Sequence, residues 1–253
     1  MKIIAVYSIK GGVGKTASAV NLAELTAQAG GRTLLWDLDP QAAATFYLRI
    51  KPEVDGGIGQ LLSGDRDVLG ALRESDHPGL DVLPADFSYR NMDLVLDAAE
   101  KPRHMFHRLL TPLSLQYDWI FLDCPPSISL SSECIFRLAD AIVTPLIPTH
   151  LSLRTHEQLS EHLAEMGPEA PQLIPFFDMV DRRKKLHNEV VAHAAAAAPE
   201  FLKSWIPYAS VIEQMGEHRA PLSSYAPRTP AAKAYRALWS EVFERINSFE
   251  AMS

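Results

Sequence analysis

The chain reads Lys10-Gly11-Gly12-Val13-Gly14-Lys15-Thr16 one residue after its first mainly apolar run, Ile3-Ile4-Ala5-Val6-Tyr7-Ser8. That run is typical of a buried parallel strand, because a strand covered on both faces carries little polar sequence. Residues 17–29 then place apolar side chains at helical spacing. A strand, a glycine-rich loop and a helix in this order favour a phosphate-binding loop over a simple glycine turn.

The residue types in this loop indicate which ligand it binds. Glycines let the backbone wrap closely, so that successive N–H groups and the helix N-terminus face phosphate oxygens. Lys15 supplies a positive charge near the β and γ phosphates, and the Thr16 hydroxyl is placed to ligate Mg²⁺. We therefore expect nucleotide binding by Gly11, Gly12, Val13, Gly14, Lys15, Thr16 and the backbone of Ala17.

Length and composition agree with one α/β domain. A chain of 253 residues buries a large core without disulfides or metal. The formal charge of −7 argues against a globally basic nucleic-acid binder but leaves a local basic patch open. Cys124 and Cys134 form no C-x-x-C pair and fit a reducing compartment. No signal peptide or membrane-length apolar stretch is evident, so we expect a cytoplasmic protein.

Strand and helix signals alternate along the chain. The regular alternation predicts a single, doubly wound, mostly parallel sheet flanked by helices, with the ligand at the carboxyl ends of the strands. We find no linker that would mark a second domain within 1–253. The expected strands cover 3–8, 32–37, 80–83, 118–123, 141–146, 173–179 and 203–207. The expected helices cover 16–29, 57–63, 67–74, 88–98, 102–114, 129–138, 152–166, 183–198 and 230–248.

Acidic residues follow two of the expected strands. One strand ends in Asp37-Leu38-Asp39-Pro40-Gln41, and another ends in Asp123-Cys124-Pro125-Pro126. An aspartate after an apolar strand far from the P-loop is the usual second anchor for Mg²⁺, and Asp123 fits that role. Asp37 and Asp39 would point to the same side if the strand persisted that far. Either could then hold water near the γ phosphate.

These motifs give the chain a family resemblance. The lysine-led K-G-G-V-G-K-T loop, the D-L-D-P-Q segment and the strand ending in D-C-P-P-S resemble those of the ParA/MinD group of deviant-Walker ATPases. The resemblance extends over most of the chain, including residues 179–183 and 225–236. It is strongest to short ParA (Soj-like) proteins, which lack the N-terminal helix-turn-helix region of longer relatives.

The resemblance implies roles for the matching positions. Lys10 matches the signature lysine that reaches the partner subunit's phosphates, so ATP would be held between two subunits of a homodimer. Asp39 matches the water-positioning aspartate, Asp37 its acidic companion, and Asp123 the Walker B magnesium ligand. The implied activity is a slow ATPase with ATP and Mg²⁺ as cofactors, stimulated by a ParB-like or cargo adaptor protein. Ala17 replaces a second threonine that many relatives carry.

DNA is the second implied partner, and the sequence supports it in part. Arg182-Arg183-Lys184-Lys185 is a basic cluster in an otherwise acidic chain. Arg183 aligns with an arginine that contacts DNA in Soj-like relatives, whereas a second family arginine falls at Val211. Arg219, Arg228 and Lys203 are candidates to compensate. We expect non-specific, salt-dependent binding of duplex DNA through its phosphates, which would associate the protein with the nucleoid.

Two rival interpretations remain open. MinD-like relatives bind membranes through a C-terminal amphipathic helix, and apolar residues recur here at Tyr235, Leu238, Trp239, Val242, Phe243, Ile246 and Phe249. The polar face is nevertheless mixed in charge, so we expect this stripe to pack on the sheet. Metabolic P-loop enzymes are the second rival: iron–sulfur reductases share a cluster through a cysteine near Walker B, and amidating or carboxylating ATP enzymes need substrate pockets that the sequence does not show. We expect Cys124 and Cys134 to be small buried side chains instead.

Overall fold

The computed structural model describes residues 1–250, with side chains through residue 248. Its sheet has seven strands in the order β3-β4-β2-β5-β1-β6-β7, and every neighbouring pair is parallel except β3 and β4. The predicted doubly wound, mostly parallel sheet is confirmed. The strands are β1 Lys2–Val6, β2 Thr33–Asp37, β3 Arg73–Glu74, β4 Leu80–Leu83, β5 Trp119–Asp123, β6 Ala141–Leu146 and β7 Gln172–Phe177.

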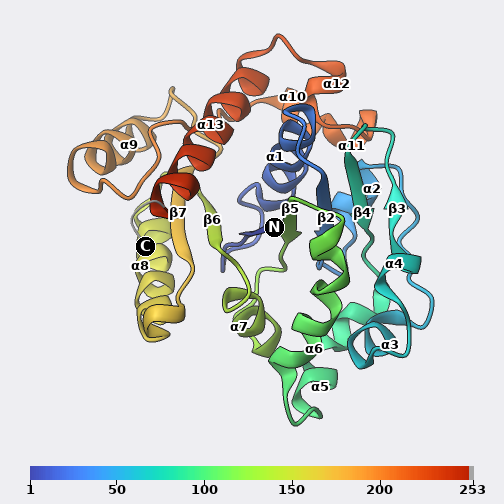
Figure 1. Cartoon of the computed structure of the whole chain (residues 1–253). Helices are drawn as coiled ribbons and strands as arrows, with labels where there is room; N and C mark the ends of the chain where they lie inside the picture. The colour runs from blue at the N-terminus through green and yellow to red at the C-terminus, as the bar shows by residue number, and fades with distance from the viewer. Residues whose placement is uncertain (251–253) are drawn as a thin grey trace.

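Helices cover both faces of this sheet (Figure 1). Buried residues of α1, α2, α11, α12 and α13 pack on one face, and those of α3, α5, α6, α7 and α8 pack on the other. The α-helices are α1 Lys15–Gln28, α2 Ala43–Tyr47, α3 Gly57–Ser63, α4 Val68–Ala71, α5 Met92–Asp97, α6 Pro102–Leu110, α7 Leu130–Phe136, α8 His150–Ala164, α9 Lys185–Ala197, α10 Ser210–Glu213, α11 Met215–His218, α12 Leu222–Tyr225 and α13 Pro230–Glu250. Short 3₁₀ turns span Phe87–Asn91, Pro112–Leu115 and Gly167–Glu169.

Six of the seven predicted strands are present, and the prediction of a strand at 203–207 is wrong. That segment makes one isolated bridge, between Val180 and Pro207. The Glu241 carboxylate of α13 accepts the backbone N–H groups of Lys203 and Ser204, each at 2.8 Å. Because these donors are taken by a side chain and Pro207 has none, a strand ladder cannot extend along the segment.

The helix predicted at 67–74 ends early, and its last residues form the edge strand β3. Asp67 caps α4 through the N–H of Leu69, but Leu72 already has an extended backbone. Arg73 and Glu74 then pair antiparallel with Val82 and Asp81 of β4. A glycine at position 70 weakens the helix, which favours this early end. Helices α2, α10, α11 and α12 are not among the predicted ones, because each is too short to show a periodic pattern.

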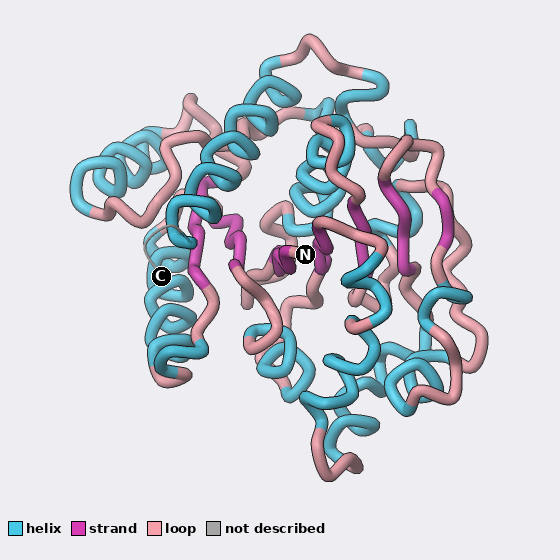
Figure 2. Tube along the Cα trace, viewed as in Figure 1, coloured by secondary structure: helices cyan, strands magenta, loops and turns pink. Residues whose placement is uncertain are grey.

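The C-terminal helix packs as expected from its apolar stripe. Tyr235, Leu238, Trp239, Val242 and Ile246 are buried, and they belong to the core that α1 also joins. Phe243 is more exposed, although its ring lies 5.7 Å from that of Trp119. The side chain of Phe249 and residues 251–253 lie outside the described residues. In Figure 2 the long helix α13 runs diagonally from the top of the molecule toward β7.

Candidate nucleotide site

The predicted P-loop lies at the carboxyl end of β1 and opens directly into α1. Gly12 and Gly14 have positive φ angles of 69° and 92°, which non-glycine residues rarely adopt. A Cβ atom on Gly14 would stand 2.0 Å from a carboxylate oxygen of Asp178, so the backbone there has no room for a side chain. Gly11 and Gly12 are exposed, whereas Val13 is buried and fixes the loop to the core.

The two lysines of the loop differ in their surroundings. Lys15 is buried, and its Nζ donates to the backbone carbonyl of Lys10 at 3.2 Å. Burial lowers the pKa of Lys15, and the nearby carboxylates of Asp123 and Asp39 oppose that shift. Lys10 is half-buried and Thr16, at the first turn of α1, is half-buried as well. Lys15 therefore faces the acidic residues that follow β2 and β5.

Asp123 lies at the carboxyl end of β5, at the same edge of the sheet as the P-loop. It ends β5 beside Asp37 of β2, and among the described residues only the Thr16 hydroxyl lies near its two buried carboxylate oxygens, without a hydrogen bond of normal geometry. Burial raises the pKa of Asp123 well above its usual value, and the charge of Asp37 adds to the shift. A buried carboxylate without a partner is costly, and a bound cation would relieve that cost. Asp123 and the Thr16 hydroxyl therefore suit a Mg²⁺ ion in their donor chemistry.

The structure separates the two aspartates that the sequence treats as alternatives. Strand β2 ends at Asp37, so the period-two argument does not reach Asp39. Asp37 is fully buried, and one of its oxygens accepts both the N–H of Thr45 at 2.8 Å and the Thr45 hydroxyl at 2.7 Å. Asp39 is half-buried, and its Oδ1 accepts the N–H of Gln41 at 2.9 Å. Asp37 therefore fixes the position of α2, whereas the second carboxylate oxygen of Asp39 is available for other contacts.

Sequence reasoning missed a second polar group behind the loop. Asp178, directly after β7, is buried against Gly14, and its oxygens accept the N–H of Met179 at 2.6 Å and the Ser18 hydroxyl at 3.5 Å. Burial raises the pKa of Asp178 to about 7. The Tyr235 hydroxyl of α13 is also buried, near Ser18, although it makes no hydrogen bond of normal geometry in the described part of the chain. The strand-end argument used for Asp37 and Asp123 would have found Asp178.

The predicted basic cluster lies apart from this edge, at the start of α9. All four residues, Arg182, Arg183, Lys184 and Lys185, are exposed. Two have acidic partners of their own: Arg183 pairs with Asp181 at 2.8 Å and Lys185 with Glu189 at 3.4 Å. The Arg183 guanidinium lowers the pKa of Asp181 to about 2. Arg182 stands 5.8 Å over the Trp205 ring, so the cluster is exposed but partly neutralised.

The residues considered as substitutes for the missing family arginine are dispersed. Val211 is half-buried, and its carbonyl accepts the Tyr225 hydroxyl at 2.6 Å. Arg219 follows α11, on the other side of α13 from α9 (Figure 1). Lys203 and Arg228 are exposed. Arg219 and the basic cluster therefore do not form one continuous patch within a single subunit.

The remaining features bear on the rival interpretations. Cys124 and Cys134 are free and buried, as expected for small apolar side chains. In residues 1–250, no helix is both long and apolar enough to cross a bilayer. The stripe on α13 that resembles a membrane-binding face packs mainly against α1 and the sheet.

Comparisons with known proteins identify relatives of the chain. A family model described as an AAA domain matches residues 1–173. The sporulation initiation inhibitor protein Soj of Bacillus subtilis is 31% identical over 247 residues, which cover 95% of this chain and 98% of Soj.

Two solved structures share the fold across nearly the whole chain. A putative plasmid partition protein from Borrelia burgdorferi, bound to AMPPNP, has a TM-score of 0.83 at 22% identity, covering 96% of this chain and 98% of its own. Cobyrinic acid a,c-diamide synthase from Mycobacterium smegmatis, with bound ADP and magnesium, has a TM-score of 0.80 at 24% identity, covering 98% and 96%.

Proposed function

Because this chain belongs to the AAA-domain family that matches residues 1–173, and to the Soj/ParA partition ATPases within it, we propose that it is an ATP-driven dimerisation switch. In this proposal residues 1–253 form one ATPase domain that binds ATP and Mg²⁺, hydrolyses ATP slowly and binds duplex DNA as a dimer. Its role is to partition or position a cargo, such as a plasmid, a chromosome region or a protein assembly.

The observation that carries the proposal is the unpartnered Asp123 carboxylate beside the P-loop. Apart from the nearby Thr16 hydroxyl, the described residues offer this buried acid no hydrogen-bond donor, so a bound cation near Lys15 and Thr16 would stabilise it. When bound, Mg²⁺ would neutralise charge on the phosphates. Thr16 and Asp123 would hold the ion, while Lys15 and the N–H groups of 11–17 would bind the phosphates.

Two further polar residues of the site, Lys10 and Asp39, would act at the phosphates. Lys10 would contact the phosphates of the partner subunit, so that ATP lies between two copies of the chain. Asp39, whose carboxylate is the more exposed of the pair after β2, would position the attacking water. Hydrolysis would then remove the charge that holds the dimer together.

DNA binding in this proposal rests on residues 182–185 and on the presence of two subunits. One subunit presents four exposed cations, of which two are paired with acids of the same segment. A dimer doubles the number of phosphate contacts, and affinity for DNA rises steeply with that number. We infer that DNA binding depends on ATP for this reason. A ParB-like or cargo adaptor protein would stimulate hydrolysis and release the dimer.

The decisive test is duplex-DNA binding by an Asp39→Ala variant, which should retain ATP and accumulate as the dimer. Binding is measured with ATP and with ADP, each at low and moderate salt, alongside the oligomeric state. We expect binding only with ATP, falling steeply with salt. Replacement of residues 182–185 by alanine should weaken DNA binding and leave dimerisation intact. Dimerisation without DNA binding in the Asp39→Ala protein would leave the ATP switch standing and overturn the DNA role.

A further inference from the structure

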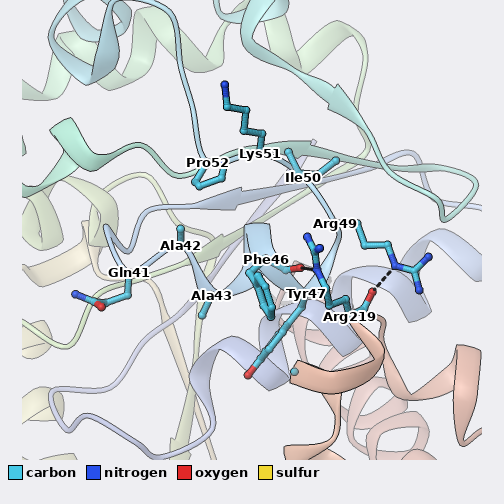
Figure 3. Close-up of a pocket in the computed structure, with 11 residues that line it drawn as sticks. Gln41, Ala42, Ala43, Phe46, Tyr47, Arg49, Ile50, Lys51, Pro52 and Arg219 are labelled. Atoms are coloured by element: carbon cyan, nitrogen blue, oxygen red, sulfur yellow. Dashed lines mark hydrogen bonds between the residues drawn. The ribbon is translucent and has the colours of Figure 1, made fainter.

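A cavity of about 790 Å³ lies beside the nucleotide edge, between α2 and α11. Its walls come from residues 41–43, 46, 47 and 49–52, in and around α2, together with Gly216 and Arg219. We call it the α2–α11 cavity. Figure 3 shows Phe46 and Tyr47 on one side of it and the two arginines, Arg49 and Arg219, side by side. Its size is in the range of small-molecule and peptide side-chain sites.

Backbone strain gathers around this cavity. In the described part of the chain, four residues other than glycine have a positive φ: Ala42, Arg49, Met179 and Arg219. Three of the four line the cavity. A left-handed conformation costs a non-glycine residue about 1 kcal/mol, so glycine would be preferred at each position on backbone grounds alone. Such conformations cluster where function requires them.

The two arginines hold the walls together, but Arg219 retains unused donors. Arg49 donates to the carbonyls of His218 and Arg219 at 3.0 and 3.2 Å, and Arg219 donates through Nε to the carbonyl of Phe46 at 3.0 Å. The Arg219 guanidinium lies 4.5 Å from the centre of the Phe46 ring. Its two terminal nitrogens make no hydrogen bond or ion pair with the part of the chain that the structure describes.

Charges around the cavity favour an anion. Arg49, Lys51 and Arg219 line it, and no aspartate or glutamate among the described residues does, although the chain as a whole carries a net charge of −7. Arg49 and Lys51 have acidic partners outside the cavity, Asp76 at 3.4 Å and Glu53. Arg219 is the lining cation that has no acidic partner within the described residues. The terminal nitrogens of a guanidinium match the two oxygens of a carboxylate.

We propose that the α2–α11 cavity receives an acidic side chain, flanked by apolar ones, from a partner protein. The carboxylate binds the terminal nitrogens of Arg219. The apolar neighbours contact Phe46, which is 47% exposed, and the adjoining walls at Ile50 and Pro52. Burial of this half-exposed ring and pairing of an otherwise unpaired guanidinium together drive binding. The left-handed conformation of Arg219 is retained because it aims the guanidinium at the ligand.

The cavity also adjoins the loop that carries Asp39. Gln41 lines the cavity, and its N–H donates to the Asp39 carboxylate. An occupant that moves Gln41 therefore alters the hydrogen bonding of Asp39. This regulatory step rests on the proposed function, whereas binding to the cavity does not. The partner segment would change the rate of ATP hydrolysis without touching the phosphates.

The binding test uses a capped pentapeptide of three glutamates alternating with two leucines, and its counterpart with glutamines in place of glutamates. Binding to the nucleotide-free protein is followed by NMR or calorimetry. We expect the glutamate peptide to bind about tenfold more tightly than the glutamine peptide. Arg219→Gly should abolish that preference, and Arg219→Lys should retain part of it. The matched control, Arg228→Gly, changes an exposed arginine elsewhere and should preserve the preference.

Thermal unfolding of Arg219→Gly separates a ligand role from a purely structural one. Glycine relieves the left-handed strain, so we expect an unchanged or higher melting temperature. A large loss of stability would show that Arg219 serves mainly to join the two helix ends. In that event Phe46→Ser, which changes a half-exposed ring, tests binding independently. Equal affinity for the two peptides, or an undiminished preference in either variant, would overturn the cavity proposal. The ATP-dependent dimer of Asp39→Ala reports separately on the proposed function.

Discussion

The P-loop edge and the start of α9 are both predicted to bind phosphates, yet they differ in how their charges are satisfied. At the P-loop edge, the Asp123 carboxylate is buried with only the Thr16 hydroxyl near it among the described residues, and Lys15 is buried against a carbonyl. At α9, Arg183 and Lys185 are exposed and already paired with acids of the same segment. A buried carboxylate with too few hydrogen-bond donors is costly and favours a bound cation, whereas an exposed cation is stable in water without a ligand. The nucleotide site is therefore the better defined of the two.

The largest expected effect is at Lys15. Lys15→Ala should weaken ATP binding by about 100-fold, because a charged hydrogen bond to phosphate contributes about 2–3 kcal/mol. Lys10→Ala is the matched control at the front of the same loop. It should leave nucleotide affinity of the monomer nearly unchanged and reduce ATP-dependent dimerisation. Calorimetric titration with ATP and Mg²⁺ measures the change in ATP affinity. Equal affinity of Lys15→Ala and the parent protein would contradict the assignment of residues 10–16 as the phosphate-binding loop.

The second prediction concerns the backbone of the P-loop at Gly14. Gly14→Ala should destabilise the protein by about 3 kcal/mol or more and abolish nucleotide binding, because its Cβ would collide with Asp178 at a positive φ. Gly59→Ala, in helix α3 with no atom close to the added methyl group, should instead stabilise by about 0.5–1 kcal/mol. Chemical denaturation of the nucleotide-free proteins measures both changes. A Gly14→Ala protein as stable as the parent would contradict the close packing of Asp178.

The third prediction links Asp178 to pH. Its folded-state pKa of about 7 lies above the unfolded value of about 3.9. In the folded state the Asp178 carboxyl group therefore stays protonated to a higher pH than in the unfolded state. The free energy of unfolding falls as pH rises from about 4 to about 7. Asp178→Asn removes this contribution, so the variant should gain up to about 4 kcal/mol relative to the parent between pH 4 and pH 8. Urea denaturation across that range tests it, and a constant difference would refute the shift.

The smallest effects are expected at α9, where they can sharpen the contrast between the two regions. Arg182 and Lys184 lack an ion pair with the described residues, whereas Arg183 and Lys185 have one each. Replacing Arg182 and Lys184 by alanine should lower the slope of log DNA affinity against log salt concentration by the amount that corresponds to about two phosphate contacts. Replacing the paired residues should reduce it less. Anisotropy titrations at several salt concentrations compare the double variants, and a larger effect of the paired residues would reverse this interpretation.

The sequence predicts the parallel sheet and the P-loop well because both depend on local patterns. Apolar runs specify β1, β2, β5 and β6, and glycine spacing specifies the loop. It fails at 203–207, where the side chain of Glu241, distant in sequence, takes the backbone donors. Strand periodicity also leaves Asp37 and Asp39 equivalent, and only the family resemblance gives them different roles. The structure shows a physical difference, because Thr45 of α2 binds Asp37 and leaves the Asp39 carboxylate more available.

The hydrogen bonds between Thr45 and Asp37 have an entropic consequence for the residue between them. They close residues 37–45 into a short ring, and the N–H of Asp39 adds a further tie to Asp37 at 3.2 Å. A short closed loop has few conformations left to lose. The freedom of Asp39 is thus reduced during folding, before any nucleotide arrives. Ligand binding then needs to supply less ordering free energy at this loop, which is the benefit of preorganisation.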